Sequence, residues 1–218
     1  MREGAATTPV GMRKRPAPTI AVIGNPNAGK STIFNRLTGL SQRVGNYPGV
    51  TVEKKVGQCA LGTVEARLID LPGTYSLAAH SPDEMVAVDL LLGHLSGEAR
   101  PDLVLQIVDA SNLERNLYLF SQVRELGLPV VLALNMTDVA TARGVHVDAD
   151  NLSRALGVPV VPVQGHRGTG LGRLREVLRD ALERAGRDGE ESRPVEPFCF
   201  EGEMPVEVDR LREAFASG

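Results

Sequence analysis

The stretch that most constrains this chain is residues 20–31, where a short apolar run leads into Gly24-Asn-Pro-Asn-Ala-Gly-Lys-Ser31. The spacing Gly-x-x-x-x-Gly-Lys-Ser is that of a P-loop, and it stands between a predicted strand and a predicted helix, as the motif requires. The glycines let successive backbone N–H groups turn toward one point, and a helix that begins near Lys30 directs its positive end there. The stretch predicts a phosphate-binding loop; a glycine-rich turn with a chance lysine is the alternative.

A second motif, Asp70-Leu-Pro-Gly73, follows a predicted strand. In nucleotide hydrolases an acidic residue at this place holds Mg²⁺, while the P-loop lysine and hydroxyl contact the phosphates and the metal. We expect Asp70 to bind Mg²⁺ through water, Ser31 to bind it directly, and Gly73 to present its N–H to the γ-phosphate. A Pro-Gly turn capped by Asp70 is the alternative.

A third motif, Asn135-Met-Thr-Asp138, comes directly after a buried apolar run. Ligands of doubly wound sheets bind at the carboxyl ends of the strands, where this motif would lie. The Asp138 carboxylate can accept hydrogen bonds from guanine N1–H and N2–H₂, a donor pair that adenine lacks. Such bonds contribute about 1.5–3 kcal/mol, which corresponds to a preference of roughly 10- to 150-fold. Asn135 is expected to brace the loop and touch the base. Capping of a helix by Asp138 is the alternative.

The periodicity of apolar residues predicts an α/β fold with a mostly parallel six-stranded sheet. We expect strands at 19–23, 50–61, 63–69, 103–108, 130–134 and 158–163, and helices at 30–38, 83–95, 112–126, 148–156 and 171–185. Residues 41–51 are predicted to be a loop by composition. The strands at 50–61 and 63–69 follow one another without a helix, so we expect one antiparallel edge strand, with helices on both faces of the sheet.

Composition divides the chain into a disordered tail (1–18), a main domain (19–185), and a linker with a partial helical domain (186–218) that includes a helix at 206–215. The net charge of −3, from 24 basic and 27 acidic residues, does not indicate a nucleic-acid partner. Neither the two cysteines nor the four histidines have a metal-binding spacing. No apolar run approaches the roughly 18–20 residues that span a bilayer, and the basic N-terminus lacks the apolar segment of a signal peptide.

The motifs in this order are those of a GTPase, and the longer strings resemble one family, the cytosolic G domain of bacterial ferrous iron transport protein B (FeoB). The matching strings are Gly24–Ser31, Arg43-Val-Gly-Asn-Tyr-Pro-Gly-Val-Thr-Val-Glu53, Asp70-Leu-Pro-Gly-Thr-Tyr-Ser-Leu77, Val108-Asp-Ala-Ser-Asn-Leu-Glu-Arg-Asn-Leu-Tyr-Leu119 and Asn135–Asp138. They cover about residues 19–180, and the strings at 70–77 and 108–119 are the specific ones.

The resemblance implies a P-loop GTPase domain that binds and slowly hydrolyses GTP and regulates ferrous iron uptake. Family members continue into a small helical (GDI-like) domain and a membrane pore for Fe²⁺, so the chain looks like a soluble fragment of a transporter at the cytoplasmic face of the bacterial inner membrane. Its implied partners are GTP and GDP, the transporter's own pore, small accessory Feo proteins and two further copies in a homotrimer. The implied cofactors are Mg²⁺ and an activating K⁺.

Residue by residue, the resemblance makes Thr51 the switch I threonine that reaches Mg²⁺, residues 70–84 switch II, and Asn27 a ligand of K⁺. Lys30, Thr51 and Gly73 are expected to be catalytic. The residues expected to contact the nucleotide are Gly24, Asn25, Pro26, Asn27, Ala28, Gly29, Lys30, Ser31, Thr32, Gly49, Val50, Thr51, Val52, Glu53, Asp70, Leu71, Pro72, Gly73, Asn135, Met136, Thr137, Asp138, Gly165, His166 and Arg167.

The chain departs from common patterns at three places. Thr74 stands where many GTPases have a water-orienting glutamine, so we expect slow hydrolysis. Gly165-His166 replaces the usual Ser-Ala or Ser-Thr, and Ala28 replaces a frequent serine, so we expect weaker nucleotide binding and fast release. Two other functions stay open: a soluble GTPase associated with ribosomes or tRNA, and a nucleotide sensor without turnover.

Overall fold

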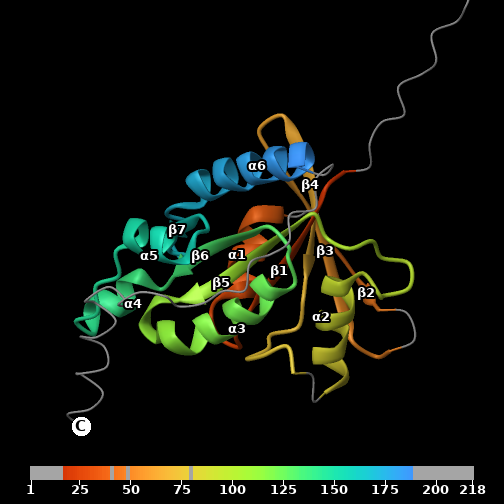
Figure 1. The fold of residues 1–218 in the computed structure, drawn as a ribbon, viewed down its shortest axis with the longest axis horizontal. Helices are drawn as coiled ribbons and strands as arrows, with labels where there is room; N and C mark the ends of the chain where they lie inside the picture. Colours follow the sequence, from red (N-terminus) through yellow and green to blue (C-terminus); the bar gives the residue numbers. More distant parts are fainter. Residues whose placement is uncertain (1–16, 40–41, 48–49, 79–80, 189–218) are drawn as a thin grey trace, which may run out of the picture.

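The computed structural model describes residues 17–39, 42–47, 50–78 and 81–188 of the chain. They form a seven-stranded sheet, in the order β2-β3-β4-β1-β5-β6-β7, with helices on both faces (Figure 1). The first sixteen residues of the predicted tail and the helix predicted at 206–215 lie outside the described residues. So does the predicted linker, apart from its first three residues, which continue the last helix.

The elements predicted between residues 19 and 185 are all present, with ends that differ by a few residues. The strands are β1 (Thr19–Gly24), β2 (Gln42–Asn46), β3 (Glu53–Leu61), β4 (Val64–Asp70), β5 (Leu103–Asp109), β6 (Val130–Asn135) and β7 (Val160–Pro162). The helices are α1 (Lys30–Thr38), α2 (Pro82–Leu92), α3 (Leu113–Glu125), α4 (Thr137–Ala142), α5 (Ala149–Leu156) and α6 (Leu171–Asp188), with a 3-10 turn, η1 (Ala110–Asn112), before α3.

The sheet is parallel through β4, β1, β5, β6 and β7, and antiparallel where β3 pairs with β4 and β2 with β3. This confirms the predicted class, but the predicted strand count was one too low. Residues 42–46, predicted as part of a loop, form the edge strand β2. Their side chains are mostly exposed, and Val44 has 64% of its surface accessible. No apolar pattern marks this strand, because pairing of its main chain with β3 is what makes it a strand.

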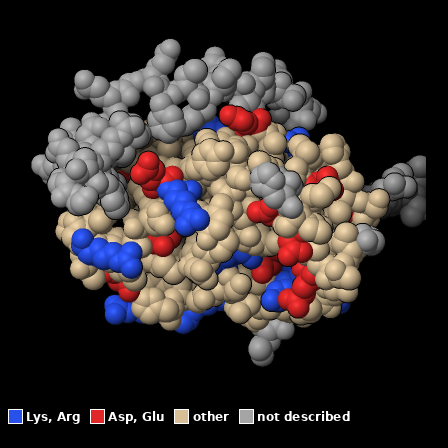
Figure 2. Space-filling model, turned by 90° about the horizontal axis from the view of Figure 1, so that it is seen from below, with Lys and Arg blue, Asp and Glu red and all other residues tan. Residues whose placement is uncertain are grey.

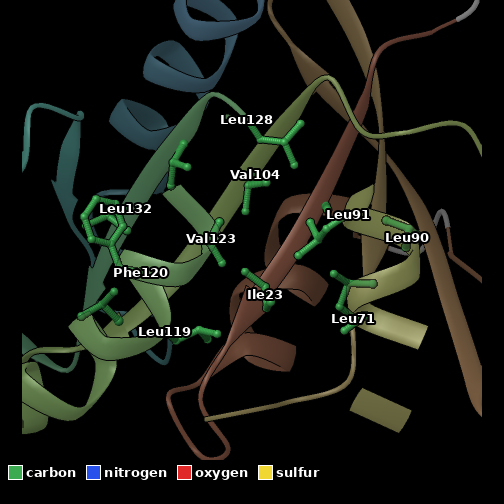
Figure 3. Close-up of a cluster of buried hydrophobic side chains, with 14 of the residues drawn as sticks. Ile23, Leu71, Leu90, Leu91, Val104, Leu119, Phe120, Val123, Leu128 and Leu132 are labelled. Atoms are coloured by element: carbon green, nitrogen blue, oxygen red, sulfur yellow. The ribbon is translucent and has the colours of Figure 1, made fainter. Parts of the chain in front are cut away.

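The side chains of each central strand alternate between two buried clusters. On β1, Ile20 and Val22 enter the cluster covered by α1 and α6, while Ala21 and Ile23 enter the cluster covered by α2, α3 and α5. Figure 3 shows the second cluster, where Ile23 and Val104 of the sheet face Val123 of α3. Burial on both faces explains the continuous apolar runs of β1, β5 and β6.

The parallel strands place three motifs at one edge of the sheet. The P-loop follows β1, Asp70 ends β4 and Asn135 ends β6. Since the carboxyl ends of parallel strands meet at the same edge, this topology brings together segments that are far apart in the sequence.

On the face seen in Figure 2, Lys and Arg side chains are interspersed with Asp and Glu. Among the helices within the described ranges, none has both the length and the apolar character needed to cross a membrane.

Candidate nucleotide-binding site

The P-loop is shaped by two close approaches of its main chain. A Cβ at Gly24 would lie 2.6 Å from the carbonyl oxygen of Ile107 on β5, and a Cβ at Gly29 would lie 2.2 Å from Nδ2 of Asn135. Gly29 also has φ of +86°, which favours glycine, and it caps the start of α1. Asn27 has φ of +67°. Left-handed residues at a helix start turn the main-chain N–H groups toward one point, as an anion site requires.

Lys30 and Asp70 form an ion pair at the carboxyl ends of the strands. Asp70 stands beside Val22 in the register of β4 with β1. The side chains of Lys30 and Asp70 are 11% and 8% exposed. Ser31, in the first turn of α1, is exposed. Mg²⁺ prefers carboxylate and hydroxyl oxygens, so the donor set of Asp70 and Ser31 fits this ion.

The segment 50–53 approaches the same edge from the antiparallel side. Lys55 of β3 stands opposite Asp70, so the residues before β3 lie near the end of β4. Thr51 is exposed there, whereas Val52 is buried. Gly49, expected to contact nucleotide, lies outside the described residues.

Tyr47, which follows β2, is 1% exposed, and burial followed by the Asp70 charge raises its pKa far above the ordinary value. The ring of Tyr47 is therefore part of the core.

The segment 73–76 packs directly on the P-loop. The Thr74 N–H donates to the Gly24 carbonyl at 3.2 Å, and a Cβ at Gly73 would lie 3.4 Å from Cα of Pro26. The Thr74 hydroxyl is turned inward, 2.6 Å from the Ser76 carbonyl and 3.1 Å from Oε1 of Glu84. The side chain at the position of the usual glutamine is thus buried, 1% exposed, and engaged with its own segment.

A cavity of about 200 Å³ lies between the P-loop, switch II and α3. Its lining residues are Asn25, Pro26, Asn27, Ala28, Tyr75, Asp109, Asn112, Arg115 and Asn116. The Arg115 guanidinium lies 3.8 Å from the centre of the Tyr75 ring, and the Arg115 carbonyl accepts a hydrogen bond from Asn25 Nδ2 at 3.3 Å. Sequence reasoning did not place Arg115 at the site, although it lies within the family-like string 108–119.

Asn135 connects the two ends of the site. Its Nδ2 donates to the Ala28 carbonyl at 2.9 Å, and its Oδ1 accepts from the Gly165 N–H at 3.0 Å. One buried amide therefore holds the P-loop against the loop that follows β7. The expectation that Asn135 braces this region agrees with these contacts.

Asp138 lies in the first turn of α4, a helix the sequence analysis did not predict. Met136, with φ of +59°, is the cap residue, and no side chain caps this helix, so the capping role considered for Asp138 is wrong. The Asp138 Oδ2 lies 3.5 Å from Nε2 of His166. Its Oδ1 is buried and has no hydrogen-bond partner among the described residues.

The other predicted contact residues lie in the same segments as those described above. Thr32 follows Ser31 in α1, Leu71 and Pro72 join Asp70 to Gly73, Thr137 precedes Asp138, and Arg167 is exposed beside His166.

Cys59 is buried in the core, and burial raises the pKa of its thiol. Within the described part of the chain, no group of three or more His, Cys, Asp or Glu side chains could hold a metal ion.

Comparison with known proteins identifies close relatives of the main domain. A family model described as "Ferrous iron transport protein B" matches residues 18–178. The Fe(2+) transporter FeoB of Salmonella typhimurium is 52% identical over 202 residues, which are 91% of this chain and 24% of that protein. The chain thus spans about a quarter of the length of this relative.

Solved structures agree with this result. The cytosolic domain of L. pneumophila FeoB is 47% identical with a TM-score of 0.70, over 75% of this chain and 68% of that one. A mutant S. thermophilus NFeoB bound to GDP is 47% identical with a TM-score of 0.68, over 76% of this chain and 61% of that one.

Proposed function

The chain belongs to the ferrous iron transport protein B family, and from this premise we propose that it is a GTP-binding switch domain that slowly hydrolyses GTP and regulates ferrous iron uptake. The observation that carries the proposal is the Asn135 bridge, with hydrogen bonds of 2.9 and 3.0 Å. The bridge ties the P-loop to the loop that carries His166, and it supports one site shared by the Lys30–Asp70 pair and the Asp138 carboxylate. Such a site has one end suited to phosphates and one end suited to a base.

At the phosphate end, Lys30 would exchange its partner Asp70 for the β- and γ-phosphates. Ser31 and Asp70 would hold Mg²⁺, with Thr51 joining them when the γ-phosphate is present. The bound metal supplies positive charge to the phosphate oxygens. The Gly73 N–H, in the segment that packs on Pro26, would donate to the γ-phosphate.

Hydrolysis would be slow because the Thr74 side chain is buried and bonded within switch II. The side chain at that position would then not orient an attacking water. Asn27, exposed at the turn of the P-loop, would offer its carbonyl oxygen to K⁺. Phosphate release measured in KCl and in NaCl tests whether the chain hydrolyses GTP and whether K⁺ stimulates hydrolysis. Absence of turnover in both salts would favour the nucleotide sensor instead.

At the base end, Asp138 would accept the N1–H and N2–H₂ donors of guanine. Exchange of its carboxylate for an amide in Asp138→Asn should move preference from GTP toward XTP by about 10-fold or more. Competition binding with GTP, XTP and ATP measures this shift. Asp150→Asn, a change in the first turn of α5 at an exposed site, is the matched control. Unchanged base preference in Asp138→Asn would contradict the assignment.

The function of the whole transporter is proposed from the family. The relatives are named Fe(2+) transporters, and one from Porphyromonas gingivalis is a fusion of Fe(2+) transport protein A with FeoB. We propose that the domain acts at the cytoplasmic face of the bacterial inner membrane, coupled to a pore and to small Feo proteins, and that it assembles as a homotrimer. Light scattering of the chain with GDP and with a GTP analogue tests the trimer.

A further inference from the structure

At the base end of the site, the imidazole of His166 lies beside the carboxylate of Asp138. His166 Nε2 lies 3.5 Å from Asp138 Oδ2, and the two side chains are 57% and 26% exposed. The other oxygen, Oδ1, is buried without a hydrogen-bond partner among the described residues. In this arrangement one oxygen of Asp138 is buried and the other lies beside an imidazole nitrogen.

Guanine needs both oxygens, because its N1–H and N2–H₂ groups lie side by side and each requires an acceptor. We propose that His166 is a specificity-determining residue: its imidazole competes with the guanine 2-amino group for Asp138, and so lowers both the affinity for guanine nucleotides and the discrimination between guanine and hypoxanthine. This proposal rests on the assignment of Asp138 as the base-binding residue.

The loop that carries His166 is held independently of the imidazole. Gly165 N–H donates to Asn135, Gly168 N–H donates to the Gln164 carbonyl at 2.8 Å, and Arg36 donates to the His166 carbonyl at 2.5 Å. These contacts involve main-chain atoms of the loop. The imidazole can therefore turn away from Asp138, or be removed, while the backbone of the loop keeps its position.

The competition has a chemical signature. Hypoxanthine has the N1–H donor but lacks the 2-amino group, so it engages one carboxylate oxygen where guanine engages two. If His166 occupies the second oxygen, its removal improves binding of GDP more than binding of inosine diphosphate (IDP). A structural role, or stacking of the imidazole on the base, would change both affinities alike.

The test is calorimetry of the full chain with GDP and IDP in Mg²⁺, for the wild type, His166→Ala, His166→Gln and His94→Ala. We expect His166→Ala to bind GDP about two- to fivefold more tightly, an effect of the size found for exposed polar contacts on a surface, and to raise the ratio of GDP to IDP affinity. His166→Gln, which keeps an N–H donor, should stay closer to the wild type. His94 is exposed at the end of α2, and its substitution is the control.

Equal or weaker GDP binding by His166→Ala, or a parallel change for GDP and IDP, would overturn this proposal. Failure of the proposed function gives a different result: the wild type would not prefer GDP to ADP, and Asp138→Asn would not alter base preference. The two proposals can thus fail separately.

Discussion

The phosphate end of the site is shaped by main chain, whereas the base end is shaped by side chains. At the phosphate end, Gly24 and Gly29 allow approaches that a Cβ would block, and Lys30 and Asp70 are nearly buried. At the base end, His166 is exposed and faces Asp138. A backbone-built site tolerates little change, because each atom is fixed by the fold. A site built from exposed side chains can differ between relatives, and the Gly165-His166 departure lies at this end.

The largest expected effect is at the phosphate end. Lys30→Ala removes the charge proposed to stabilise the transferring phosphoryl group, so GTP hydrolysis should fall by about 10²- to 10³-fold. Phosphate release at saturating GTP measures this. Lys55→Ala is the control, because Lys55 is 37% exposed and pairs with Glu53. A rate of GTP hydrolysis by Lys30→Ala within a few-fold of the control would show that Lys30 does not act in hydrolysis.

Asn135→Ala tests whether the two ends depend on one bridge. It leaves the Ala28 carbonyl and the Gly165 N–H without their partner, and a lost hydrogen bond with a buried group costs about 1–3 kcal/mol. We expect GDP affinity to fall by roughly 10-fold and the unfolding free energy by about 2 kcal/mol. Calorimetry and urea denaturation measure these changes. A change in base discrimination alone would show that the phosphate end and the base end do not depend on one bridge.

Two glycine substitutions compare the ends directly. Gly29→Ala combines a positive φ with a clash against Asn135, so unfolding free energy should fall by about 2 kcal/mol. Gly165→Ala places a Cβ 3.1 Å from Cγ1 of Ile33, a side chain that can yield, so the loss should be under about 1 kcal/mol. Urea denaturation of both variants measures the difference. Equal losses would show that the base end is as rigid as the P-loop.

A small effect is expected outside both ends. Glu98 is 7% exposed and pairs with Lys54 and Arg67, so although burial raises its pKa, these partners lower it below the ordinary 4.5. Glu98→Gln should reduce unfolding free energy by about 1 kcal/mol at neutral pH. Because a lowered pKa gives stability that is lost on acidification, this difference should shrink as pH falls below 4.5. Denaturation at several pH values measures it, and GDP affinity should not change.

The α/β class and the order of the main elements could be predicted from the chain. Strands β1, β5 and β6 are buried on both faces and appear as continuous apolar runs. The three motifs each follow a strand, so their position at one edge of the sheet followed from the topology of parallel strands. Roles of individual residues in binding nucleotide stay predictions.

Other features could not be predicted from local pattern. The strand β2 has exposed residues and exists because it pairs with β3. Helix α4 has only six residues, too few for a periodic signal. The stacking of Arg115 on Tyr75 joins two segments that are forty residues apart in the chain.

Motif spacing and apolar periodicity are properties of neighbouring residues, and they were enough to indicate a P-loop GTPase with its motifs in order. The inward turn of Thr74, the Asn135 bridge and the contact between His166 and Asp138 arose only when the chain had folded. The physical reason is that each depends on the distance between atoms of separate segments, and packing of the whole sheet sets that distance.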